Sequence, residues 1–155
     1  MSSEKTNVMR ILDKNKIAYK EYTYDATKYV SGNDVAQSLN QDPNRVYKTI
    51  VTVAKNNYYV FMLPVNNELD LKKCAKAVNE KSIQMLPLKE LLPLTGYVHG
   101  GCSPIGLKKS FPVVIDDSCL KQDKIIFSGG KRGYQVELAL NDLLHITSCK
   151  VEEIV

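Results

Sequence analysis

The chain has 155 residues, of which 44% are hydrophobic and 25% are charged, and its formal net charge is +4. These values are ordinary for a globular protein, so they exclude a disordered chain, and the length suits a single domain over 1–155. No run of eighteen apolar residues and no apolar leader segment occurs, so we expect neither a membrane helix nor secretion. A pI of about 8.8 only modestly favours a polyanionic partner.

Cysteine and histidine are sparse and scattered along the chain. The cysteines stand at 74, 102, 119 and 149, the histidines stand at 99 and 145, and no Cys-x-x-Cys pair occurs. A structural zinc site needs ligands clustered at short spacing, so the sequence predicts no metal site, and we expect no cofactor. Free thiols and the lack of a signal segment suit the reducing cytoplasm, which is the expected location.

The first half of the chain combines helical periodicity with stretches rich in β-branched and aromatic residues. In chain order we expect a helix over 5–17 with Ser3 or Thr6 as its cap, a strand over 19–24, a short helix over 34–39, and a β-hairpin made of 46–54 and 57–65.

The second half continues the mixture of helices and strands. We expect a helix over 69–78, a short helix over 87–92, strands over 112–115, 125–127 and 134–140, a last helix capped by Asn141 or Asp142 that runs through His145, and an edge strand in the tail. Because strands and helices do not alternate strictly, the pattern favours the α+β class.

Lys48 stands in an otherwise apolar strand, Val46-Tyr47-Lys48-Thr49-Ile50-Val51. Strand alternation leaves apolar residues on both faces, so neither face is cleanly exposed to solvent. An ammonium in such surroundings loses hydration and needs an anion, carbonyl groups or a substrate. The alternative is a solvent-facing position on an amphipathic strand, and spacing alone does not decide between the two.

Two glycine-rich segments follow, at 100–106 and 128–133. Glycine permits a close approach of the backbone, so the amides of the first segment could form an oxyanion hole. Its alternative is a tight hairpin. The second segment could be an anion-binding nest or a plain turn between strands. Neither segment has the spacing of a Walker loop or of a dinucleotide fingerprint.

Cys102 lies inside the first glycine-rich segment and is a candidate nucleophile. No histidine stands at a diagnostic spacing to activate it, and His99 three residues earlier is not evidence of activation. Ser103 and Ser128 lack a Gly-x-Ser-x-Gly elbow, so the sequence contains no recognisable catalytic triad.

Six short blocks occur in a specific order over nearly the whole chain. They are Asn15-Lys16-Ile17 followed by Tyr24; Val46-Tyr47-Lys48-Thr49; Leu69-Asp70-Leu71-Lys72-Lys73; Thr95-Gly96-Tyr97 leading into 100–106; Lys108-Lys109; and 128–133. In this order the chain resembles the YbaK family of bacterial aminoacyl-tRNA deacylases, within the group related to the editing domain inserted in prolyl-tRNA synthetase.

The resemblance implies a mixed, partly barrel-like β-sheet flanked by helices. It also implies release of a wrong amino acid from tRNA, typically cysteine from Cys-tRNA(Pro). By the same resemblance, Lys48 would position the tRNA 3′ end or the ester, and the amides of Gly100 and Gly101 would hold the ester carbonyl. Pocket-lining positions would be Tyr24, Thr49, Ser128 and Gly129. The implied partners are the aminoacylated acceptor end of tRNA and, as a docking partner, prolyl-tRNA synthetase.

Three positions depart from the family pattern. Relatives have an aromatic residue where this chain has Val30 or Ser31, an aspartate where it has Gln135, and an aliphatic residue where it has Cys102. These changes leave open whether the substrate carries cysteine, alanine or another small amino acid. A non-catalytic module that binds a nucleotide or the tRNA acceptor end is the remaining alternative.

Overall fold

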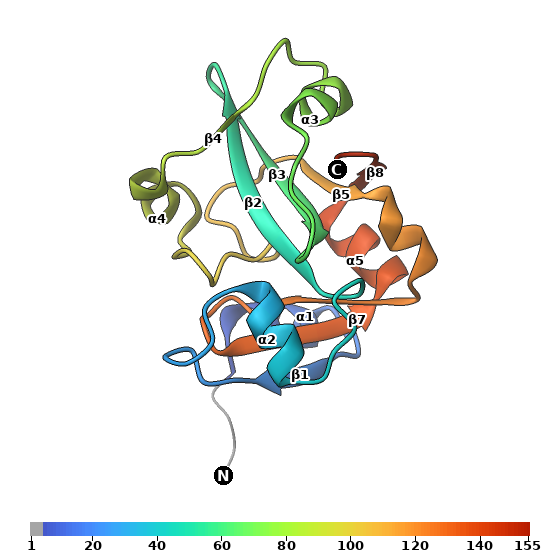
Figure 1. Cartoon of the computed structure of the whole chain (residues 1–155). Helices are drawn as coiled ribbons and strands as arrows, with labels where there is room; N and C mark the ends of the chain where they lie inside the picture. Colours follow the sequence, from blue (N-terminus) through green and yellow to red (C-terminus); the bar gives the residue numbers. More distant parts are fainter. Residues whose placement is uncertain (1–4) are drawn as a thin grey trace.

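The computed structural model describes residues 5–155, which form helices packed around two β-sheets (Figure 1). The elements are α1 (Asn7–Lys14), β1 (Lys20–Thr23), α2 (Gly32–Ser38), β2 (Tyr47–Ala54), β3 (Asn57–Pro64), α3 (Leu71–Ala77), β4 (Gln84–Met85), the 3₁₀ helix η1 (Leu88–Glu90), α4 (Leu91–Thr95), β5 (Val113–Asp116), the 3₁₀ helix η2 (Asp117–Lys121), β6 (Lys124–Ser128), β7 (Tyr134–Ala139), α5 (Leu140–Thr147) and β8 (Lys150–Glu152). Within residues 5–155, no helix is long and apolar enough to cross a membrane.

The strands form one sheet of three and one of five. The smaller sheet has the order β1-β7-β6 and is antiparallel, and the larger has the order β4-β2-β3-β5-β8. In the larger sheet β4, β2 and β3 pair antiparallel, whereas β3-β5 and β5-β8 pair parallel. A parallel bridge between Val46 and Ile126 joins the two sheets. The predicted α+β class and mixed sheet are confirmed, but the described strands do not close into a barrel.

The predicted hairpin of β2 and β3 is confirmed, and it separates two parts of the core. Because successive side chains of a strand point to opposite faces, Val60 and Met62 of β3 pack into a core with α1, β6, β7 and α5. Phe61 and Leu63 pack on the other face, against α3. All four side chains are fully buried, so β3 is held from both sides and β2 is fixed in register beside it.

Caps were predicted from the sequence for the first and the last helix, and only the first prediction is correct. Thr6 caps α1 as predicted, because its Oγ1 accepts from the N–H of Met9 at 3.2 Å; Ser3, the other candidate, lies outside the described residues. The predicted caps of the last helix are wrong. That helix begins at Leu140, whose N–H donates to the carbonyl of Asp123 at 2.9 Å, so Asn141 and Asp142 already lie in its first turn.

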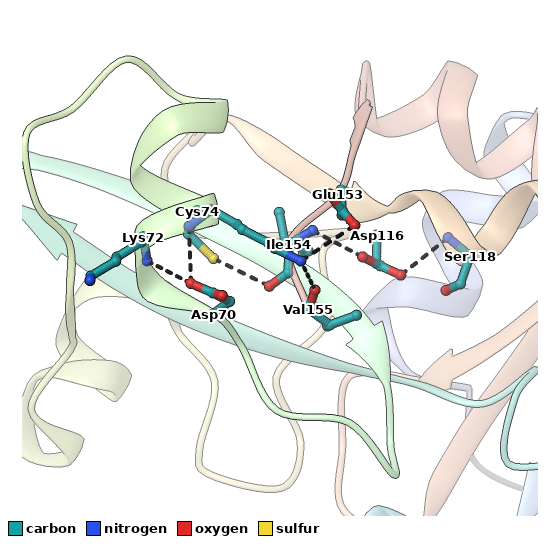
Figure 2. A network of polar contacts seen from close by, with 9 residues as sticks. Asp70, Lys72, Cys74, Asp116, Ser118, Glu153, Ile154 and Val155 are labelled. Carbon is teal, nitrogen blue, oxygen red and sulfur yellow. Dashed lines mark hydrogen bonds and ion pairs between the residues drawn. The ribbon is translucent and has the colours of Figure 1, made fainter.

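The C-terminal tail is fastened to the large sheet, where β8 forms the predicted edge strand. Figure 2 shows the buried carboxylate of Asp116 accepting from the N–H of Ile154 at 3.0 Å and from the N–H of Ser118 at 3.1 Å. The carbonyl of Ile154 in turn accepts from the N–H of Asp70, which caps α3. The tail therefore connects β5 to the beginning of α3.

Candidate functional site

A cavity of about 630 Å³ opens beside the first half of β2. It is lined by residues from segments that lie far apart in the sequence, namely residues within 30–35, all of 46–51, residues within 85–91, His99, Gly100, Cys102, Phe127, Ser128, Tyr134 and Gln135, together with Tyr24, Val65 and Glu68. Figure 1 shows α2 below the N-terminal end of β2 and α4 on the side of the strand away from β3, and residues of both helices line the cavity.

The edge of β2, and not one of its faces, forms the floor of the cavity. All six residues from Val46 to Val51 line it, which alternation on one face would not allow. The neighbouring strand β4 pairs only with Thr52 and Val53, so the edge of β2 is open before that point. The carbonyl of Val51 turns toward this edge, where it accepts from the N–H of Leu86 at 3.2 Å. The backbone of Thr49, two residues earlier, faces the same way and is available to a ligand.

Lys48 is partly buried and not enclosed, with 28% of its side chain exposed. Its Nζ lies 3.6 Å from Oε1 of Glu68, whose side chain is 92% exposed. This ion pair is long and solvated, so it holds the ammonium weakly. Lys48 therefore presents a cation to the cavity that an anionic group of a ligand can take over.

The next residue, Thr49, carries an unpartnered hydroxyl on the opposite face of the strand. Its Oγ1 is buried, and it has no hydrogen-bond partner among residues 5–155. A buried hydroxyl without a partner costs about 1–3 kcal/mol. Because Thr49 also lines the cavity, a ligand that reorients this side chain can supply the missing partner.

The first glycine-rich segment is an irregular loop with no strand in it, so the tight-hairpin alternative is wrong. Gly100 lines the cavity and has a positive φ of 86°, a conformation that glycine adopts without strain. Its N–H donates to no acceptor among the described residues. Gly101 differs, because its N–H donates to the carbonyl of Val98 at 3.0 Å and the residue does not line the cavity.

The second glycine-rich segment is the hairpin loop between β6 and β7, so the plain-turn reading is confirmed. The N–H of Gly129 donates to the carbonyl of Tyr134 at 2.9 Å, and the N–H of Gly130 donates to Oγ of Ser128 at 3.1 Å. These amides are occupied within the loop and do not form a free nest. Ser128 and Tyr24 line the cavity, whereas Gly129 does not.

Arg132 of this loop reaches across to the first glycine-rich segment. A methyl group at Gly100 would stand 3.6 Å from Cγ and Nε of Arg132, so the arginine side chain lies directly over the glycine. Its Nη2 donates to the carbonyl of Ala26 at 3.1 Å. Arg132 thus ties together three loops at the rim of the cavity.

Cys102 lines the cavity but is a poor nucleophile. It is buried, with 7% exposure, and burial raises the pKa of its thiol to about 12. Only the thiolate attacks efficiently, so this cysteine is almost entirely protonated at neutral pH. Burial and the raised pKa therefore disfavour Cys102, the candidate nucleophile of the sequence analysis, as an attacking group.

Several residues that line the cavity could not be recognised as site residues from the sequence. Glu68 follows β3 in a polar turn, and His99 had no spacing that assigned it a role. Gln135 is buried at the cavity wall, where its Oε1 accepts from Nε2 of Gln41 at 2.8 Å. An exposed apolar rim is formed by Val30, Met85 and Leu88. Of the predicted site residues, five line the cavity together: Lys48, Gly100, Tyr24, Thr49 and Ser128. Gly101 and Gly129 do not line it.

Relatives of known sequence resemble the chain over its full length. It is 44% identical over 155 residues to the protein of Enterococcus faecalis named "Putative Cys-tRNA(Pro)/Cys-tRNA(Cys) deacylase EbsC", covering 99% of this chain and 94% of that protein. It is 25% identical over 104 residues to the proline–tRNA ligase of Pseudothermotoga lettingae, a match that covers 67% of this chain and 18% of the ligase. The similarity to the ligase is thus confined to a part the size of one domain.

A solved structure has the same fold. The crystal structure of "a putative trans-editing enzyme for prolyl tRNA synthetase" superimposes with a TM-score of 0.83 and 22% identity, covering 98% of both chains. The model of the aminoacyl-tRNA editing domain family matches residues 28–146, which include β2, both glycine-rich segments and every residue that lines the cavity except Tyr24. The family resemblance predicted from the ordered sequence blocks is confirmed, and the chain belongs to the aminoacyl-tRNA editing domain family.

Proposed function

We propose that the protein is a trans-editing deacylase that releases cysteine from Cys-tRNA(Pro). The observation that carries this proposal is a set of polar groups around one cavity: the ammonium of Lys48, held only by a long and solvated ion pair with Glu68, and the hydroxyl of Thr49 and the N–H of Gly100, which have no partner among the described residues. An aminoacyl ester at the 3′ end of tRNA offers phosphate, hydroxyl and carbonyl oxygens that can serve as partners of these three groups. The relatedness to the deacylase of Enterococcus faecalis supports the same substrate.

The size of the cavity supports a nucleotide-linked substrate. A volume of about 630 Å³ lies within the range of roughly 300–1,000 Å³ that is usual for ligand pockets, and it exceeds the need of one small amino acid. The aminoacyl group and the terminal nucleoside of tRNA would share it. The apolar rim at Val30, Met85 and Leu88 would then lie against the nucleoside.

In this proposal Lys48 positions the substrate and does not attack it. Its side chain stands at the open edge of β2, beside the backbone of Thr49, where a phosphate or ester oxygen would replace Glu68 as its partner. The role of a fixed cation requires no shift of the lysine to a neutral form, which a nucleophilic amine would need.

The N–H of Gly100 would hold the ester carbonyl. A backbone donor aimed at the developing oxyanion contributes about 10²–10³ in rate. Gly101 was predicted to share this role, and it would have to give up its bond to Val98 to do so. We therefore place the first donor at Gly100, with Tyr24 and Ser128 lining the space around the amino acid.

The attacking group would come from the substrate. The thiol of an esterified cysteine can close on its own carbonyl carbon: the C–S bond forms, the ester C–O bond breaks, and the thiol proton ends on the 3′ oxygen of the ribose. Proximity favours such a ring closure strongly. An enzyme nucleophile is then unnecessary, which fits the buried and protonated Cys102. For an alanyl ester, water must attack in place of the thiol.

A separate editing protein is useful because a synthetase pocket distinguishes small side chains of similar size by only about 1–3 kcal/mol. We propose that the protein works in the cytoplasm, where it meets mischarged tRNA. Its own contacts with tRNA would be largely electrostatic and salt-dependent. With a net charge of only +4, the protein would bind tRNA weakly by itself. Docking on prolyl-tRNA synthetase would compensate by raising the local concentration of the substrate.

A panel of charged tRNAs tests the proposal. Purified protein is incubated with Cys-tRNA(Pro), Ala-tRNA(Pro) and Pro-tRNA(Pro), and the loss of each aminoacyl ester is followed over time. We expect Cys-tRNA(Pro) to be cleared fastest and Pro-tRNA(Pro) to survive. Clearance of Ala-tRNA(Pro) with an intact cysteinyl ester would assign the alanine specificity instead, and binding without any turnover would assign the non-catalytic module.

A further inference from the structure

Glu68 is the only carboxylate that lines the cavity among the described residues. It stands in the short connection between β3 and α3, and the backbone on both sides of it is fixed. The N–H of Asn67 donates to the carbonyl of Pro64 at 3.0 Å, and the N–H of Asp70 donates to the carbonyl of Ile154 at 2.8 Å. The carboxylate is therefore presented from a defined backbone, while its side chain remains free to turn.

The contact between Glu68 and Lys48 is weak, so the carboxylate of Glu68 can bind another cation. The separation of 3.6 Å between Nζ and Oε1 is longer than a charge-assisted hydrogen bond, and 92% of the glutamate side chain is exposed. Such solvated pairs contribute little to stability. Glu68 can accordingly exchange Lys48 for another cation at small cost, provided that this cation arrives at the same point of the cavity.

The substrate brings one cation and several anionic or electron-rich groups. Lys48, Thr49 and Gly100 serve the phosphate, hydroxyl and carbonyl oxygens, and none of them can accept a hydrogen bond from an ammonium and also neutralise its charge. Gln135 is neutral, and its Oε1 is already bonded to Gln41. The cavity thus leaves only one described residue to balance the positive charge of an α-amino group.

Resting on the proposed function, we propose that Glu68 accepts the α-ammonium of the aminoacyl ester. The α-ammonium and the ester carbonyl are separated by one carbon atom, so the ammonium lies close to the group that holds the ester, and Glu68 stands 3.6 Å from Lys48, the residue proposed to position the ester or the tRNA 3′ end. Glu68 would then be a substrate-selecting residue: it favours a free amine, which aminoacyl-tRNAs carry, and it disfavours an N-acylated one. When the substrate leaves, the carboxylate returns to Lys48.

A comparison of two substrates in two variants tests this assignment. Cys-tRNA(Pro) and N-acetyl-Cys-tRNA(Pro) both keep the thiol and the ester, and they differ only at the α-nitrogen. The single-turnover rate is measured for wild type, Glu68→Gln and the control Glu153→Gln, below about pH 7, where an α-amino group with a pKa of about 7.7–8.0 is cationic. Glu153 is a matched control because it pairs with Lys73 at 3.3 Å, is 64% exposed, lies in the C-terminal tail (Figure 2), and does not line the cavity.

The wild type is expected to prefer the free amine by on the order of tenfold, the size of effect of a hydrogen bond to a charged group. Glu68→Gln should lose this preference by slowing the free-amine substrate alone, and Glu153→Gln should behave as wild type. The assignment is overturned if Glu68→Gln keeps the wild-type ratio between the substrates, or if it accelerates both, which would make Glu68 merely a counterion that competes for Lys48. If the wild type hydrolyses neither ester, the proposed function itself fails, so the two failures are distinguishable.

Discussion

The side chain of Arg132 lies over Gly100 and holds the glycine-rich loop against the β6–β7 turn. Because the same guanidinium donates to the carbonyl of Ala26 at 3.1 Å, one exposed residue fixes three loops at the cavity rim. We predict that Arg132→Ala lowers kcat/KM for Cys-tRNA(Pro) by about tenfold, since a small displacement of a donor amide weakens its bond to the oxyanion. A deacylation time course checks this.

Charge and geometry at Arg132 can be separated. Arg132→Lys keeps the positive charge near the rim but cannot reproduce the planar fork of donors. If the loop is held by geometry, the lysine variant should lose most of the activity that the alanine variant loses, at low and at high salt alike. Full activity of Arg132→Ala would show that the loop holds its conformation without the arginine.

Removal of the unpartnered hydroxyl of Thr49 is expected to lower activity without lowering stability. Thr49→Val keeps the shape of the side chain and removes a buried group that has no partner within residues 5–155. We expect unchanged or higher stability, by up to about 1 kcal/mol, because an unsatisfied buried hydroxyl is unfavourable. Deacylation should fall by about tenfold. Urea unfolding and a single-turnover assay on the same preparation measure both, and an active Thr49→Val protein would remove Thr49 from the site.

The buried carboxylate of Asp116 should matter for stability and not for catalysis. It accepts from the N–H groups of Ile154 and Ser118, so Asp116→Ala leaves two donors without their partner (Figure 2). The expected loss is about 1–3 kcal/mol in the free energy of unfolding. Asp117→Ala is the matched control, because Asp117 is exposed. Under conditions where both variants are folded, their deacylation rates should equal that of the wild type.

Buried thiols make the stability depend on alkaline pH. Burial raises the pKa values of Cys102 and Cys119 from 9.0 to about 12, so the unfolded chain loses these protons before the folded chain does. The stabilisation is complete below about pH 9 and is lost as the pH rises toward 12, at about 1.4 kcal/mol per pH unit for each fully titrating thiol. Urea unfolding between pH 8 and roughly 11 under reducing conditions measures the slope.

The double variant Cys102→Ala with Cys119→Ala should reduce this alkaline slope without abolishing it, because burial also raises the pKa values of Cys74 and Cys149 to about 11. A slope that the double variant leaves unchanged would mean that other groups carry the dependence. Cys102→Ala alone should still deacylate Cys-tRNA(Pro), because a thiol with a pKa of about 12 is not the attacking group.

Local signals in the sequence were sufficient for most elements and singled out several residues that line the cavity. The hairpin of β2 and β3, the Thr6 cap and the edge strand in the tail all follow from periodicity and capping chemistry. Lys48 was conspicuous as a charged residue in an otherwise apolar strand, and its proposed role came from the family resemblance of the ordered blocks around it. Its environment was less predictable: the strand is open at its edge because β4 is only two residues long, and no local pattern encodes that length.

The rest of the site depends on where distant loops meet. Gly101 was predicted as a carbonyl-binding donor together with Gly100, but the turn at Gly100 directs the N–H of Gly101 to Val98. Nothing in the sequence distinguishes the two glycines. Glu68 belongs to no sequence motif either, and its proposed role follows only from its position in the cavity lining, close to Lys48.

The most direct test of the account is the single-turnover rate of Cys-tRNA(Pro) deacylation by wild type and by Lys48→Ala, with tRNA binding measured on the same samples. The account predicts rapid loss of the cysteinyl ester with the wild type and a rate about 10²-fold lower with Lys48→Ala, while the variant remains folded. A wild type that binds the charged tRNA without cleaving it, or a Lys48→Ala variant as fast as the wild type, would contradict the central claim.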